Sequence, residues 1–220
     1  RSYSDNPLLV SLYGNEMIKG LKEANVIACS KHFPGHGNTS VDSHYGLPTI
    51  TSTKDELYQT ELAPFISAIN NGIDSIMTTH IIFTAIDEKY PATLSEKVLT
   101  GLLREQLGFD GVIFTDGMEM GAVTNNFGGH DQTAIMAVKA GVDVLTYTSI
   151  NSPITAHKAI TKAVQSGEIS EERINESVRR ILLTKLKYGV LDLDYNITND
   201  IHSLLINNEK LNNYIKLTNP

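Results

Sequence analysis

The chain has 220 residues, 41% hydrophobic and 20% charged, a composition ordinary for one globular domain with a core of its own. The formal net charge is −7 and no long run of Lys and Arg occurs, which argues against nucleic acid as a partner because phosphate binding needs clustered cations. No apolar run approaches the roughly 20 residues of a membrane-spanning helix, so we expect a soluble protein. The single cysteine, Cys29, lies in an apolar run and is predicted to be a buried, inert thiol.

Apolar periodicity predicts helices that alternate with short strands. In chain order the predicted elements are a helix at 7–24, a strand at 26–30, a helix at 53–71, a strand at 73–79, a helix at 95–107, a strand at 111–115, a helix at 130–140, a strand at 142–147, and helices at 153–166 and 170–187. Asn6 before Pro7 is typical of a helix start, and Thr53 with Glu56 has the spacing of a capping box. Gly72 suits the end of the helix before it.

The alternation of helices with short apolar strands indicates βα units and a parallel sheet, hence an α/β fold. Each predicted strand ends in polar or ionisable residues, which are Lys31 with His32, His80, Asp116 and Tyr147. Chemistry at the carboxyl end of every strand is typical of a (β/α)8 barrel of the TIM-barrel type. A doubly wound sheet shares part of this pattern, but no Gly-rich phosphate loop follows any of the strands.

Four strands are too few for a closed barrel, which typically needs eight strands and about 250 residues. The chain also opens on Arg1 without an initiator Met, so we expect residues 1–190 to be the C-terminal part of a barrel domain, incomplete here. Processing or truncation would have removed what came before, including any secretion signal, so cytoplasmic and exported locations both stay open. Residues 191–220 are rich in Asn and Asp and are predicted to form a polar tail or linker.

The segment 31–44 is the densest cluster of ionisable residues, with three His, one Lys and one Asp in fourteen positions. Asp42 and His44 lie two residues apart, so in an extended loop their side chains point the same way. A neighbouring carboxylate raises the pKa of a histidine and sets its tautomer, and such a histidine can donate a proton and later take one back. Lys31 and His32 could bind hydroxyl groups of a ligand, or could be a surface pair without a role.

Asp116 comes directly after an apolar strand, where a carboxylate can attack an electrophilic carbon and form a covalent intermediate. The alternative is that Asp116 caps the following helix, and Glu119, three residues later at capping-box spacing, favours that alternative. His80 at another strand end is either a ligand contact or a histidine whose hydrogen bonds are satisfied within the protein.

The segment Lys31–Gly37, which reads Lys-His-Phe-Pro-Gly-His-Gly, together with Asp42–His44, resembles the signature of glycoside hydrolase family 3 in its β-N-acetylglucosaminidase (β-hexosaminidase) branch. Further segments are similar to that branch in the same order, at 1–3, 77–81, 111–116 and 179–189. The resemblance covers nearly the whole chain. It implies the catalytic barrel of that family and retaining hydrolysis of a terminal β-linked N-acetylglucosamine.

Carried over residue by residue, the resemblance implies that Asp116 is the nucleophile and His44 the general acid/base, with Asp42 as its partner. The residues implied in binding the sugar are Lys31, His32, Arg1 and His80. No cofactor or metal is expected, and the expected partner is a glycan or muropeptide that contains N-acetylglucosamine. Water and phosphate both stay open as acceptors, since a histidine acid/base adds no negative charge that would repel the anion.

The early strands of the family supply an Asp that holds the outer hydroxyls of the sugar, and no segment here matches them. We therefore expect the isolated chain to be inactive or very weakly active. Two other interpretations remain. One is a non-catalytic half-barrel remnant, and the other is a metal-dependent hydrolase whose ligands would be His32, His36, Asp42 and His44.

Overall fold

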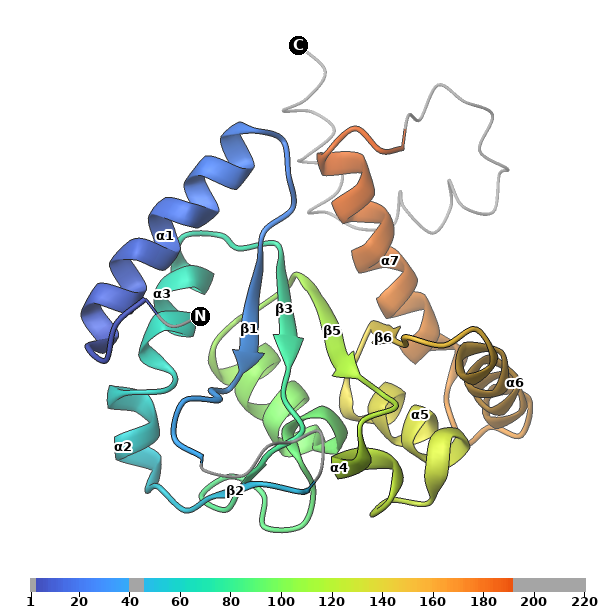
Figure 1. Ribbon diagram of the computed structural model, residues 1–220. Coiled ribbons are helices and arrows are strands. Elements are labelled where there is room, and N and C mark those ends of the chain that lie inside the picture. Colours follow the sequence, from blue (N-terminus) through green and yellow to red (C-terminus); the bar gives the residue numbers. More distant parts are fainter. Residues whose placement is uncertain (1–2, 40–45, 192–220) are drawn as a thin grey trace.

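The computed structural model describes residues 3–39 and 46–191 (Figure 1). Three of the predicted site residues, Arg1, Asp42 and His44, lie outside the described residues. The predicted polar tail lies outside them as well, apart from its first residue. Among the helices of the described ranges, none combines the length and the apolarity that crossing a bilayer requires.

Four strands of the described chain form one sheet in the order β1-β3-β5-β6. They are β1 (Cys29–Phe33), β3 (Ser75–Thr78), β5 (Val112–Gly117) and β6 (Val144–Thr146). Every neighbouring pair is parallel, so the predicted sheet of βα units is confirmed. A second, two-stranded parallel sheet of β2 (Thr49–Ile50) and β4 (Ile82–Phe83) was not predicted, because two-residue strands carry no periodicity.

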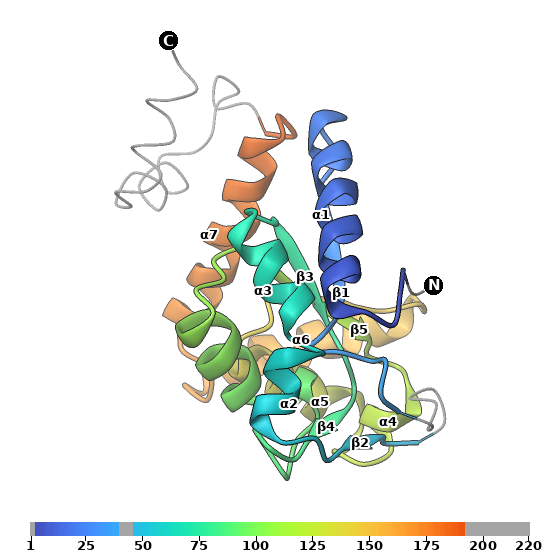
Figure 2. The same ribbon diagram turned by 90° about the vertical axis from the view of Figure 1, so that its left-hand side faces the viewer.

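Helices lie along the sheet from one edge to the other. Figure 1 shows α1 and α3 near β1, at one edge, and α6 and α7 near β6, at the other. The helices are α1 (Pro7–Glu23), α2 (Lys54–Gln59), α3 (Ala63–Asn70), the 3₁₀-helix η1 (Ala92–Leu94), the π-helix η2 (Lys97–Gln106), α4 (Gly121–Thr124), α5 (Gly129–Ala140), α6 (Asn151–Gln165) and α7 (Glu171–Lys187). Figure 2 shows α1 and α7 rising toward one end of the molecule, while α2, α4 and the small sheet gather at the other end. The strands of the main sheet point toward that second end.

The predicted helix starts are confirmed. The Asn6 side chain accepts a hydrogen bond from the backbone N–H of Leu8 at 2.9 Å, and the capping box of Thr53 and Glu56 is formed in both directions. The single helix predicted over 53–71 is wrong, however, because the chain forms α2 and α3 with a break between them. Pro64 lies in the first turn of α3, and a proline cannot donate the hydrogen bond that would continue α2.

The first strand begins three residues later than predicted. The apolar run before it is mostly exposed, with Val26 48% and Ile27 38% accessible, and its cysteine is exposed too. The prediction of a buried Cys29 is therefore wrong. In the described chain β1 lies at an edge of the sheet and pairs with β3 alone. Apolar residues of this segment therefore need not be buried. The shift places Lys31 and His32 within the strand rather than after it.

The core lies between the sheet and the helices that cover it. Phe33, Ile76 and Ile113 from three neighbouring strands are each fully buried, as are Leu99 and Leu103 of η2. Burying a side chain of this size is worth about 1.5–3 kcal/mol, so this packing holds β1, β3 and β5 in register. It thereby sets where the carboxyl ends of the three strands lie.

A buried ionic network closes the opposite end of the sheet. Asp143, just before β6, has a fully buried side chain that faces Arg104 of η2 and two arginines of α7. Its carboxylate accepts hydrogen bonds from Arg104 at 2.7 Å, Ser177 at 2.6 Å, Arg180 at 3.3 Å and the Ile113 backbone N–H at 2.9 Å, with Arg173 at 3.6 Å. One carboxylate thus joins a helix, a strand and the last helix of the domain.

Replacing Asp143 by Asn is expected to destabilise the fold by about 3–5 kcal/mol, because it leaves three largely buried arginines without their counter-charge. Urea denaturation followed by circular dichroism measures this difference. The control is Glu168→Gln, which removes the exposed pair of Glu168 with Lys139 at 3.4 Å and should cost less than about 1 kcal/mol. Equal losses in the two variants would contradict the structural role of Asp143.

Candidate active site

The parallel sheet brings three of the predicted site residues to one edge. His32 belongs to β1, His80 follows β3, and Asp116 lies near the end of β5. His32 Nε2 lies 3.4 Å from Asp116 Oδ2, although β3 runs between their strands and neighbouring strands are about 4.8 Å apart. The two side chains therefore lean toward each other across the end of β3.

The carboxylate of Asp116 is held by its own turn and stays partly open. Oδ1 accepts a hydrogen bond from the Gly117 backbone N–H at 2.8 Å, and the side chain keeps 27% of its surface accessible. The helix that follows begins at Gly121, and no side chain caps it. The alternative interpretation of Asp116 as a helix cap is therefore wrong, because α4 begins too far along the chain.

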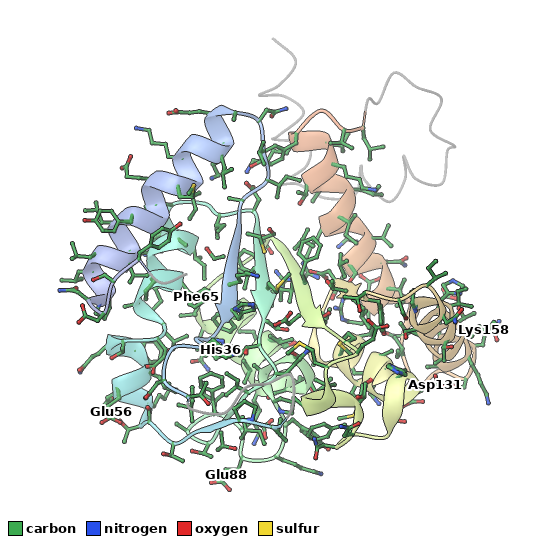
Figure 3. The ribbon with its side chains drawn as sticks, viewed as in Figure 1. His36, Glu56, Phe65, Glu88, Asp131 and Lys158 are labelled. Atoms are coloured by element: carbon green, nitrogen blue, oxygen red, sulfur yellow. The ribbon has the colours of Figure 1, made fainter. Side chains whose placement is uncertain are left out.

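His32 lies between the carboxylate and a second imidazole. Its side chain is only 14% accessible, and the ring of His36 meets it edge-on with centroids 5.6 Å apart. Figure 3 shows His36 just beyond the end of β1, on the rim where the strands finish. Sequence reasoning considered His36 only as a metal ligand, whereas the structure makes it a neighbour of His32.

His80 lies inside the wall of the site rather than on its surface. The residue is fully buried. Its Nδ1 lies 2.8 Å from the Thr93 hydroxyl and its Nε2 lies 3.0 Å from the Gly117 carbonyl oxygen. Both ring nitrogens thus meet protein atoms, as in the interpretation of a satisfied strand-end histidine. The prediction that His80 binds sugar directly stays a prediction that this geometry does not favour.

The turn after Asp116 is anchored to the next strand. The Met118 N–H donates to the Thr146 carbonyl at 2.9 Å. Glu119, which the capping-box spacing had linked to Asp116, accepts instead from the backbone N–H groups of Thr148 at 2.7 Å and Ser149 at 3.2 Å. The sequence carries no local signal for this contact, because its partners lie about thirty residues further along the chain.

An open hollow of about 1650 Å³ lies over these side chains. His32, His36 and Asp116 line one part of it, and Lys31 lies at its edge on β1. The hollow continues between the sheet and α1, where its lining is largely apolar. A partly open carboxylate beside an imidazole, in a hollow with a polar end, can bind a polyhydroxylated ligand and attack it.

Only part of the alternative metal site belongs to the described residues. In residues 3–39 and 46–191 no three His, Cys, Asp or Glu side chains are grouped as metal ligands. Two of the four ligands that the metal interpretation names, Asp42 and His44, lie outside those ranges. The described half of that set, His32 and His36, consists of two rings in edge contact.

Comparison with known proteins agrees with the fold. Residues 1–184 match the family model described as the glycosyl hydrolase family 3 N terminal domain. The chain belongs to glycosyl hydrolase family 3. Its parallel βα units are therefore part of the barrel-like catalytic domain of that family, as the resemblance implied.

Three relatives define the neighbourhood within the family. A family 3 β-N-acetylglucosaminidase from Paenibacillus sp. str. FPU-7 superposes with a TM-score of 0.84 at 43% identity, over 92% of this chain and 40% of that one. β-Hexosaminidase A of Pseudoalteromonas piscicida is 34% identical over 206 residues, 85% of this chain and 34% of the relative. A secreted glycosyl hydrolase of Arthroderma benhamiae is 35% identical over 187 residues, 82% of this chain and 52% of the relative. The chain thus spans a third to a half of the length of these relatives.

Glu119 should make the stability of the fold depend on pH. Hydrogen bonds from Ser149 and Thr148 hold the pKa of the Glu119 carboxyl well below its ordinary value of 4.5. A lowered folded-state pKa stabilises the fold above the unfolded-state value and loses that effect as pH falls below it. We expect Glu119→Gln to lower the urea midpoint at pH 7, with the gap to the parent narrowing below about pH 4.5.

The matched control is Glu88→Gln, which changes an exposed carboxylate on the rim (Figure 3). That variant should keep the parent midpoint at both pH values. A Glu119→Gln gap that stays constant from pH 7 to pH 4 would show that the contact does not depend on the charge of the carboxylate.

Proposed function

We propose that this chain carries the nucleophile and acid/base part of a retaining β-N-acetylglucosaminidase. The strongest support is the position of the Asp116 carboxylate in the open hollow. Its Oδ1 accepts a hydrogen bond from the Gly117 N–H, and its Oδ2 faces His32 at 3.4 Å. A carboxylate so oriented at the carboxyl end of a strand can attack a carbon bound above the sheet. The names of the relatives support N-acetylglucosamine as the sugar.

The first step transfers the sugar to the protein. His44, polarised by Asp42, gives its proton to the glycosidic oxygen while Asp116 attacks the anomeric carbon. The bond from the carboxylate oxygen to the anomeric carbon forms as the bond to the leaving group breaks. The leaving alcohol departs neutral because it has taken the proton.

The second step returns the protein to its starting state. Water attacks the anomeric carbon, His44 takes the proton of that water, and the carboxylate of Asp116 leaves. The Gly117 N–H on Oδ1 orients the carboxylate that attacks in the first step and leaves in the second. Net inversion at each step gives overall retention.

Two of the residues proposed to hold the sugar, Lys31 and His32, line the same hollow as this carboxylate. Lys31 is exposed on β1 beside the hollow, and its ammonium group can donate to hydroxyl oxygens. His32 lies 3.4 Å from the carboxylate and lines the same hollow. Arg1 is proposed for the same role from the resemblance alone. The natural ligand is proposed to be a glycan or muropeptide with a terminal N-acetylglucosamine.

A second function is a half-barrel that binds sugar or a partner without turnover. It is favoured by the open side of the described sheet, where Val26, Ile27 and Cys29 are exposed at the β1 edge. An exposed parallel edge is unusual in a self-sufficient α/β domain, whose sheets are normally covered. In this case the hollow would bind N-acetylglucosamine while Asp116 has no effect on catalysis.

Replacing Asp116 by Asn is expected to lower the release of nitrophenol from a β-N-acetylglucosaminide by at least about a thousandfold, because the amide is a far weaker nucleophile. The parent chain should itself be weakly active, so the assay needs micromolar protein and long incubation. The control is Asp55→Asn in the exposed first turn of α2, which should keep the parent rate.

Two results would contradict the proposal. One is a parent chain that binds N-acetylglucosamine by calorimetry but releases no nitrophenol above background, which would favour the half-barrel function. The other is an Asp116→Asn variant with the parent rate.

Replacing His44 by Ala should slow hydrolysis by about 10²–10⁴-fold for alkyl or sugar leaving groups, which need protonation. The loss should be smaller for dinitrophenyl substrates, because that leaving group departs readily without a proton. Rates for a series of leaving groups measure the difference. A uniform loss across the series would contradict the acid role of His44.

A further inference from the structure

His80 has no role in the two chemical steps, yet it is among the most enclosed polar residues of the site. It follows β3, is fully buried, and is held at both ring nitrogens. It lies outside the lining of the hollow. A buried histidine with two defined partners is costly to place and rigid once placed, so its two hydrogen bonds fix the groups that they join.

The partners determine which nitrogen carries the proton. Gly117 offers a carbonyl oxygen, which can only accept, so Nε2 must be the donor at 3.0 Å. The Thr93 hydroxyl lies 2.8 Å from Nδ1, 2.7 Å from the Thr78 hydroxyl and 3.0 Å from the Thr79 carbonyl oxygen. A neutral ring fits when Thr93 accepts from Thr78 and directs its single proton to Nδ1 rather than to the Thr79 carbonyl. A cationic ring would place a charge in a fully buried position.

The residue held by His80 is the one that orients the nucleophile. The N–H of Gly117 donates to Asp116 Oδ1 at 2.8 Å, and the carbonyl of the same residue accepts from His80. Gly117 is thus fixed at both its peptide groups. Glycine has no side chain to restrict its backbone, and a Cβ placed there would meet only Met120 at an ordinary 3.7 Å. Hydrogen bonds rather than sterics must therefore hold this turn.

We propose that His80 is a positioning residue, which sets the orientation of the Asp116 carboxylate through Gly117 and does not touch the sugar. The chain of contacts runs from Thr93 in η1 through His80 to the turn after β5. It joins two βα units of the sheet at the point where the chemistry is proposed. This inference rests on the proposed function, because it takes Asp116 to be the group that needs orientation.

Two substitutions with side chains of different length test the roles of the two His80 ring nitrogens separately. The amide nitrogen of Gln in His80→Gln reaches about as far as Nε2 and can still donate to Gly117. The shorter amide in His80→Asn matches Nδ1 and removes the side-chain donor to the Gly117 carbonyl, which keeps only the Met120 backbone N–H at 3.1 Å. We expect kcat to fall about 10–100-fold in His80→Asn with KM nearly unchanged, since small errors in nucleophile placement act on the transition state. His80→Gln should recover most of the parent kcat.

A second pair of variants tests the other end of the chain of contacts. Thr93→Val removes the hydroxyl that faces Nδ1, and Thr93→Ser keeps it. We expect the Val variant to lose kcat in the same direction as His80→Asn, and the Ser variant to restore it. If His80→Asn fails to fold, this pair carries the test. Equal kcat in Val and Ser variants would then overturn the proposal.

A measurement without substrate separates this inference from the proposed function. Long-range ¹H–¹⁵N NMR of the chain at pH 7 should show the His80 proton on Nε2. The Gly117 amide and the Asp116 carboxyl carbon should shift in His80→Asn and return in His80→Gln. A proton on Nδ1 alone, or unshifted Gly117 and Asp116 signals in His80→Asn, would overturn the positioning role. An Asp116→Asn variant at the parent rate would overturn the proposed function and leave these NMR results unaffected.

Discussion

Parallel pairing of the four strands of the main sheet is the constraint on which the rest of this structure depends. Because β1, β3, β5 and β6 run in one direction, their carboxyl ends meet at one edge of the sheet. Residues more than eighty positions apart, His32 and Asp116, therefore come within 3.4 Å of each other. The hydrophobic packing of three strands against η2 holds the register that this contact needs.

The two ends of the sheet carry different kinds of polar group. At the amino ends, Asp143 is fully buried and saturated by arginines, and Asp74 before β3 meets Lys187 and Tyr188 at the end of α7. At the carboxyl ends, Asp116 directs Oδ2 toward His32 in an open hollow, and its side chain stays 27% accessible. A carboxylate whose oxygens are all occupied by arginines can only stabilise the fold. An oriented carboxylate that stays accessible can react with a ligand. This division is what barrel enzymes show between their stability face and their catalytic face.

The β1 side of the sheet gives the hollow its size and its apolar part. Several large side chains of α1 are exposed there, among them Leu8 at 76% and Leu12 at 54%. The relatives are two to three times longer than the region that they share with this chain. The part of the hollow that holds His32, His36 and Asp116, by contrast, comes from β1, β5 and the loop after β1, and Glu56 of α2 also lines the hollow. Asp116 and its imidazole neighbour His32 are thus positioned by contacts within this chain.

Local chemistry in the sequence by itself determined the helix starts at Asn6 and Thr53 and the alternation of strands and helices. These features depend on neighbours within a few positions, so they can be predicted from the sequence alone. Only the tertiary structure decided that Cys29 is exposed, that Glu119 turns to the β6 loop, and that His80 lies beneath Gly117. Each of these depends on residues thirty or more positions away, or on which strand lies at the sheet edge, and packing alone brings such partners together.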